Sequence, residues 1–240
     1  MNTARKVFHG MAMACLCWVV TSNVSATTQT QQQTTAWNNF VDWQGGYWKC
    51  TWDSSGGLGY AYGRPSAATS TPHKQIAEQF LDSLKPTFFI SSITQDLEFA
   101  DSVVIDLGQN SVVGYSWHQL LNGIRVVPGQ VSVNMTDSGR IYNVCAATTN
   151  PDLPFDYSSA ILSAAEADSI FKDSIDLPSS AASKTTLSYV AVSDSNLLVW
   201  LVNVDPSARD NQGNFTQYNC GAVRQSGEII EVGDARSFRG

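Results

Sequence analysis

The chain has 240 residues and carries 21 acidic against 14 basic side chains, which gives a net charge of −7 at neutral pH. This acidic balance argues against a nucleic-acid partner, because binding to phosphates needs Lys and Arg. The length allows one or two domains.

The first 26 residues predict a secretory signal peptide. Arg5 and Lys6 precede an apolar run from Met11 to Val20, and Val24-Ser-Ala26 is typical of a cleavage site. A run of this length is too short to cross a bilayer as a helix, and nothing later is apolar for long enough. The alternative is a buried N-terminal helix. Residues 27–240 would then be a secreted, periplasmic or extracellular protein with 12 basic and 21 acidic side chains.

Three cysteines remain after that cleavage, namely Cys50, Cys145 and Cys220. In an oxidising compartment two of them are expected to pair and one to stay odd. Cys145 and Cys220 each end a predicted strand and are the favoured disulfide, with the other two pairings left open. No Cys-x-x-Cys or Cys/His spacing indicates zinc, and no cofactor is predicted.

The elements of the first half follow in chain order. Residues 27–35 are polar and of low complexity, which predicts a disordered leader. Tyr47–Trp52 and Leu58–Tyr62 predict a hairpin around a Gly-rich turn. Thr71-Pro72 opens a predicted helix with apolar side chains at helical spacing, and strand character is strongest over 103–107. Three strands are then expected between 114 and 145. The turns between them are Asn122-Gly123 and Asp137-Ser-Gly139.

The second half begins after a turn-rich connector at 150–154, which is the best domain boundary in the sequence. Apolar residues at helical spacing predict a helix over Ser158–Ile175, ended by Pro178. Four strands should follow, at Leu187–Val192, Leu197–Val204, Phe215–Arg224 and Glu228–Val232. We therefore expect an α+β fold of two antiparallel-sheet modules, each with a packed helix. The modules would span 36–149 and 155–233, with 234–240 as a tail.

The first module resembles the propeptide (FTP) motif that precedes the catalytic domain of fungalysin- and thermolysin-type metallopeptidases. The resemblance rests on a strand ending in Gln119, the Asn122-Gly123 turn, an apolar pair that includes Val127, and a second turn at Gly139. The second module resembles the PepSY domain of the same precursors, through Leu162–Ala167, the strand Leu198–Val204 and Val223–Ile230. Together the two modules cover roughly residues 100–232. Arg125, Pro128 and Cys145 depart from the family pattern.

The resemblance implies a protein without catalysis of its own. The family's precursors continue into a peptidase with a zinc-binding His-Glu-x-x-His motif, which is missing from this sequence. By resemblance, the partner would be a secreted thermolysin-like metallopeptidase, which this chain would inhibit or help to fold. Arg236, Phe238 and Arg239 in the tail are candidates for contact with the peptidase cleft. The alternatives are an extracellular binding or adhesion module with no peptidase partner, and a remnant of a longer peptidase precursor.

One local pattern suggests catalysis only weakly. Ser116 and His118 lie two residues apart within Gly114–His118, close to the pattern of a nucleophile elbow. Such an elbow needs a strand-to-helix turn and a distant His. Because both residues fall on one face of one predicted strand, we expect no catalytic pair here.

Overall fold

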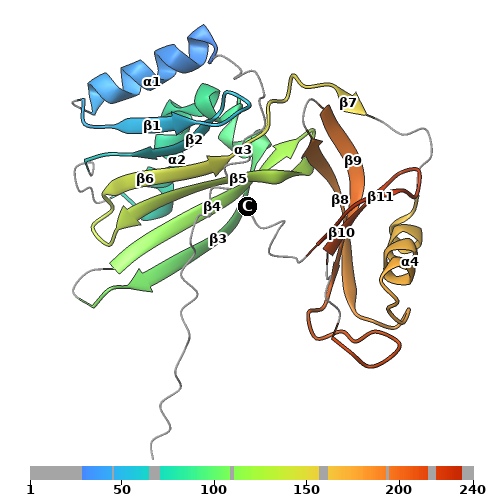
Figure 1. Cartoon of the computed structure of the whole chain (residues 1–240). Coiled ribbons are helices and arrows are strands. Elements are labelled where there is room, and N and C mark those ends of the chain that lie inside the picture. Colours follow the sequence, from blue (N-terminus) through green and yellow to red (C-terminus); the bar gives the residue numbers. More distant parts are fainter. Residues whose placement is uncertain are drawn as a thin grey trace, which may run out of the picture.

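The protein is described by a computed structural model that covers residues 29–44, 46–64, 71–108, 111–156, 162–192, 195–215 and 220–233. The predicted signal peptide, 1–26, and the predicted tail, 234–240, lie outside these residues. The fold is mixed α+β, as expected, and the strands of the described residues form one 11-stranded sheet with helices against it (Figure 1).

The first half is a strongly twisted antiparallel sheet with helices on one side. Its strands are β1 (Lys49–Trp52), β2 (Leu58–Tyr62), β3 (Leu97–Asp106), β4 (Ser111–Leu121), β5 (Ile124–Thr136) and β6 (Ile141–Ala147). The helices are α1 (Gln31–Trp43), α2 (His73–Ser83), the 3-10 turn η1 (Lys85–Phe88) and the short α3 (Ile93–Asp96). The expected hairpin at 47–62 and the three strands between 114 and 145 are confirmed.

Helix α1 overturns part of the predicted disordered leader, because residues 31–35 form its first turns. The Thr30 hydroxyl accepts a hydrogen bond from the Gln33 backbone, and the Gln33 side chain accepts one from the Thr30 backbone. This capping box satisfies backbone donors that a helix start leaves open. Phe40 then anchors the helix, since its ring packs edge-on against Trp48 and Phe80. Residues 31–35 are therefore held in a helix by the capping box at its start and by the packing of Phe40 into the core.

The second half is a smaller antiparallel sheet with one helix on its outer face. The chain passes through β7 (Phe155–Asp156), α4 (Ala164–Ser174), β8 (Ser183–Val192), β9 (Ser195–Val204), β10 (Cys220–Arg224) and β11 (Ile229–Gly233). The order in the sheet is β8-β9-β10-β11, and β7 runs parallel to β9. Figure 1 shows α4 on the side of this sheet that faces away from the first half.

Helix α4 begins later than the apolar pattern predicts. Ser163 is its N-cap, and a capping box with Glu166 closes the first turn, so the helix proper starts at Ala164 rather than near residue 158. On the inner side Phe171 is fully buried, and its ring lies against Gly221 of β10. Of the predicted strand Phe215–Arg224, Cys220–Arg224 form β10, and residues 216–219 lie outside the described residues.

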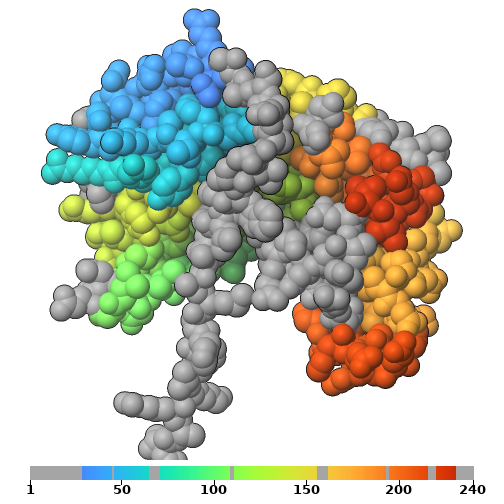
Figure 2. Space-filling model, in the orientation of Figure 1, coloured from blue at the N-terminus to red at the C-terminus, as the bar shows by residue number. Residues whose placement is uncertain are grey.

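The two halves share strand β5, which corrects the expectation of two separate antiparallel sheets. The later part of β5 pairs with β6, while Arg125–Val127 at its start pair in parallel with Ser188–Val190 of β8. Leu121, Val126 and Tyr189 form a small buried cluster at this junction. The sheet is thus continuous, although the halves stand as distinct lobes in Figure 2, the first blue to green and the second orange to red.

Candidate functional site

Gln119, the first residue of the propeptide-like motif, is a fully buried structural link. Its side-chain nitrogen donates to the Thr149 carbonyl at 2.9 Å, and its side-chain oxygen accepts from the Thr149 backbone N–H at 2.8 Å. These bonds tie the end of β4 to the segment that leaves β6 for the second half. Gln119 therefore fixes where the chain crosses between the lobes.

The remaining motif residues are turns and core. Asn122 and Gly123 both have positive φ, 52° and 76°, in the two-residue turn between β4 and β5. Such a turn favours Asn-Gly, because few other residues adopt that conformation cheaply. Gly139, at φ 75°, makes the turn after β5, and Val127 is buried in the junction core. The motif residues are thus distributed along the three neighbouring strands β4, β5 and β6, here called the β4–β6 ribbon. Gln119 and Val127 lie nearest the junction.

A groove of about 530 Å³ lies where the β4–β5 hairpin meets the face of the second sheet. The hairpin contributes Leu120, Gly123, Ile124 and Arg125, while β8 and β9 contribute residues that include Lys184, Ser188, Leu201 and Asn203. Ser183 and Thr185 of β8 bond to Asp168 on α4. Because side chains alternate along a strand, Lys184 and Ser188 point to the opposite, groove side. This volume lies within the usual range of small-ligand pockets.

Arg125 is the central charged residue of the groove. Its Nη2 donates to Nδ1 of His118 at 2.8 Å, so the His118 ring acts as an acceptor there. Burial, together with the charge of Arg125, lowers the pKa of His118 to about 4, and the ring is therefore neutral at pH 7. Burial also lowers the pKa of Arg125, and the Glu98 carboxylate opposes that shift. The charged residues that line the groove are Arg125, Lys184 and Glu98, so the groove has one net positive charge in a chain of net charge −7.

Two polar atoms of the groove residues have no partner. The Ser188 side chain is fully buried, yet its Oγ makes no hydrogen bond, and neither does the Nε of Arg125. Arg125 and Ser188 are register partners in the parallel β5–β8 pair, so they sit side by side on neighbouring strands. Leaving a buried donor unpaired costs on the order of 1–3 kcal/mol. The groove therefore holds two adjacent donors that lack an acceptor.

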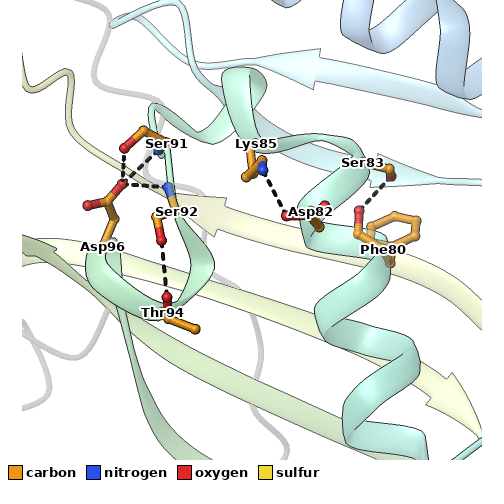
Figure 3. Close-up of polar contacts among 8 residues, drawn as sticks. All are labelled: Phe80, Asp82, Ser83, Lys85, Ser91, Ser92, Thr94 and Asp96. Atoms are coloured by element: carbon orange, nitrogen blue, oxygen red, sulfur yellow. Dashed lines mark hydrogen bonds and ion pairs between the residues drawn. The ribbon is translucent and has the colours of Figure 1, made fainter.

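Glu98 lies at the start of β3 and lines the groove. Hydrogen bonds hold the segment that precedes this strand. The Asp96 carboxylate accepts hydrogen bonds from the Ser91 and Ser92 backbones and from the Ser91 hydroxyl (Figure 3). Burial alone would raise the pKa of Asp96, but these hydrogen bonds lower it below the ordinary value. One turn earlier, Lys85 pairs with Asp82 at 2.8 Å. The turn at 91–96 sets the start of β3 and hence the position of Glu98.

The predicted disulfide partners lie in different halves. Cys145 is on β6 and Cys220 on β10, and β5, β8 and β9 intervene in the strand order. Neighbouring strands are spaced about 4.8 Å apart, whereas bonded cysteines have Cα atoms within about 7 Å. The hydrogen-bonded ladder does not bring the pair together, and their disulfide stays a prediction. The tail residues Arg236, Phe238 and Arg239 lie outside the described residues.

Ser116 and His118 bond to different partners. The Ser116 hydroxyl donates to the Asp101 carbonyl at 3.3 Å, whereas His118 is engaged by Arg125. Within the described ranges, no group of three or more His, Cys, Asp or Glu is arranged to hold a metal ion. None of the helices described there is long and apolar enough to cross a membrane.

No protein-family model matches the chain, and no curated protein sequence matches it.

The sequence did not identify the groove residues as a site. Arg125 differs from the propeptide pattern, because a charge stands where that pattern has a small or apolar residue. Lys184 lies before the predicted strand Leu187–Val192 and Ser188 within it, and no local pattern sets either residue apart. The signal that could have found Arg125 was that departure from the family pattern next to the Asn122-Gly123 turn.

Proposed function

We propose that this chain is a secreted, non-catalytic protein that binds a thermolysin-like metallopeptidase, as an inhibitor, a folding template or both. The observation that supports the proposal best is the structural role of the motif residues. Gln119 satisfies a buried backbone pair, and Asn122, Gly123 and Gly139 occupy positive-φ turns. The residues that carry the resemblance are thus ones that the β4–β6 ribbon needs for its shape.

Under this proposal, the β4–β6 strands belong to the propeptide-like module, and the second sheet belongs to the PepSY-like module. In the proposed arrangement, the ribbon and the β8–β11 sheet present a partner surface, and the tail after Gly233 enters the cleft of the peptidase. An extended segment binds a protease mainly through backbone hydrogen bonds, so Arg236, Phe238 and Arg239 would set selectivity.

The test is inhibition of a panel of purified thermolysin-like peptidases by the full chain, with complex formation followed by co-elution. We expect at least one peptidase to be inhibited in competition with a small zinc-chelating inhibitor of its active site. Indifference across the panel would contradict the proposal. Adding the chain to a denatured catalytic domain during refolding separates the two roles, because a template raises the recovered activity and a simple inhibitor does not.

Deleting 234–240 tests the tail separately. The truncated chain should keep the thermal transition of the full chain and lose inhibition. Unchanged inhibition would show that the tail does not enter the cleft, and the proposal of a peptidase partner would still stand.

The second candidate is an extracellular binding module with no peptidase partner. The groove between the halves favours it, because Arg125 Nε and Ser188 Oγ lack acceptors there. A remnant of a longer peptidase precursor is the third candidate, and a cooperative thermal transition of the purified chain would count against an unfolded fragment.

A further inference from the structure

The groove at the β5–β8 junction has the features of a small-ligand site. It is concave, it is lined by both halves of the molecule, and it combines an apolar wall with a few convergent polar groups. Leu120, Ile124, Leu187 and Leu201 form the apolar part, and the polar part consists of Glu98, Arg125, Lys184, Thr186, Ser188 and Asn203. A ligand can place an apolar body against Leu120, Ile124 and Leu201 and a polar end against Arg125 and Ser188.

The polar end must accept hydrogen bonds. Arg125 Nε–H has no acceptor, and the buried Ser188 hydroxyl has no partner of either kind. These groups belong to register partners on adjacent strands, and both residues line the groove. Both atoms are buried in the free protein, so a ligand group bonds to them when the side chains that cover them move aside. A carboxylate presents two acceptor oxygens to a guanidinium, which makes it the natural counterpart of Arg.

The charge of the groove favours a single negative charge. Arg125 and Lys184 are opposed by Glu98, which leaves one net positive charge among the charged lining residues. His118 adds none near pH 7, because its pKa is lowered to about 4. A dianion such as a phosphate monoester would be repelled by Glu98 and find only one Arg, whereas a carboxylate matches the balance.

We infer that this groove binds an apolar carboxylate, held by Nε of Arg125 and the hydroxyl of Ser188. Two sources share that chemistry, namely a free short-chain carboxylic acid and the C-terminal residue of a peptide. The inference goes beyond the proposed function and does not depend on a peptidase partner.

The test is calorimetric titration of the full chain with three probes at neutral pH: hexanoate, N-acetyl-leucine and N-acetyl-leucinamide. We expect saturable binding of at least one acid, with a dissociation constant on the order of 1 mM for ligands of this size, and no saturable binding of the carboxamide. Preference for N-acetyl-leucine over hexanoate would assign a peptide C-terminus, and the reverse a free acid. Equal binding of the carboxamide, or no binding of either acid, would overturn the inference.

Variants separate binding from folding. Ser188→Ala should weaken binding of the acid by about tenfold. Its Tm should be unchanged or higher, because the substitution removes a hydroxyl that makes no hydrogen bond in the free protein. Arg125→Lys keeps the charge, loses the Nε–H and should also weaken binding by about tenfold. The matched control is Ser183→Ala on the opposite face of β8, where the hydroxyl bonds to Asp168, and binding should be unaffected. If Ser188→Ala binds the acid as tightly as the wild type does, the assignment is wrong.

Discussion

The side chain of Gln119 makes two hydrogen bonds to the backbone of Thr149, 30 residues away, one through each of its polar atoms. All the groups involved are buried, so water cannot replace either bond. The link joins the strand before the Asn122-Gly123 hairpin to the segment that leads into the second half. One amide thereby holds the β4–β5 hairpin against the connector.

Replacing Gln119 with Leu should destabilise the protein by about 2–4 kcal/mol, because it leaves a buried N–H and a buried C=O of Thr149 without partners. Urea unfolding measures the change in the free energy of unfolding. The matched control is Gln79→Leu on the exposed side of α2, where we expect a change within about 0.5 kcal/mol. Similar small changes in both variants would mean that the Gln119–Thr149 link does not stabilise the fold.

Gly221→Ala should destabilise the second half through a clash. A Cβ at Gly221 of β10 would clash with the ring of Phe171, which α4 holds fully buried against that strand. Overpacking of this kind costs about 1–3 kcal/mol. The control is Gly59→Ala in β2, where the nearest atoms lie 3.7 Å away and the added methyl group meets ordinary contacts. A lower Tm for Gly221→Ala alone is expected from thermal unfolding, and equal values would contradict the packing.

Local signals in the sequence explain which elements could be predicted. Asn122-Gly123 and Gly139 indicated turns, because positive φ is open to few residue types, and the strands between them followed. Helix α1 was missed because its first turn is a Gln-rich run that composition assigns to disorder. Trp37, Phe40 and Val41 nevertheless have helical spacing, and Thr30 with Gln33 forms a recognisable capping box.

The groove, by contrast, depends on a contact between distant strands. Arg125 and Ser188 meet only because the start of β5 pairs in parallel with β8, and a parallel pair has no hairpin to announce it. Alternation along β8 predicts which of its residues share a face, but not what that face meets. The coarse α+β class therefore followed from the sequence, whereas the shared sheet and its groove did not.

The pKa of His118 predicts a loss of stability in mild acid. In the folded protein the pKa is about 4, against about 6.5 for an unperturbed His, so the unfolded chain binds the extra proton first. Stability should be complete above about pH 6.5 and fall as the pH drops toward 4. The full shift corresponds to about 3 kcal/mol, and because the ring is only partly buried we expect about 1–2 kcal/mol.

Urea unfolding at several pH values between 4 and 7.5 measures this slope. His118→Asn provides the control, since the amide oxygen can still accept from Arg125 but does not titrate there. The slope between pH 6.5 and 4 should be shallower in that variant. Identical slopes in both proteins would show that His118 is not the group responsible.

The ion pair between Asp168 and Lys172 should stabilise α4 against the second sheet. The Lys172 side chain is only 5% exposed, its Nζ lies 2.7 Å from the Asp168 carboxylate, and it also donates to the Ser179 carbonyl. Asp168→Asn would leave the buried ammonium without its counter-charge, which we expect to cost about 2–4 kcal/mol.

Two comparisons check that explanation. Adding Lys172→Met to Asp168→Asn should recover part of the loss, because no unpaired buried charge remains. Glu78→Gln removes the partner of Lys74 in an exposed pair at 3.6 Å, where a change below about 0.5 kcal/mol is expected. A double variant less stable than Asp168→Asn alone would contradict the role assigned to the buried charge.

The Cys50 thiol should react slowly in the folded protein. Burial raises its pKa to about 11, and a hydrogen bond with Trp52 offsets this only in part, so very little thiolate is present at pH 8. Because the thiolate is the reactive form, iodoacetamide should label Cys50 far more slowly in the folded protein than in the unfolded chain. Peptide mapping without reduction follows each cysteine, and labelling in urea counts all thiols. Labelling of Cys50 alone in urea would support the Cys145–Cys220 disulfide, whereas labelling of all three cysteines would contradict it. Rapid labelling of Cys50 in the native chain would mean that its thiol is not held in the apolar setting of β1.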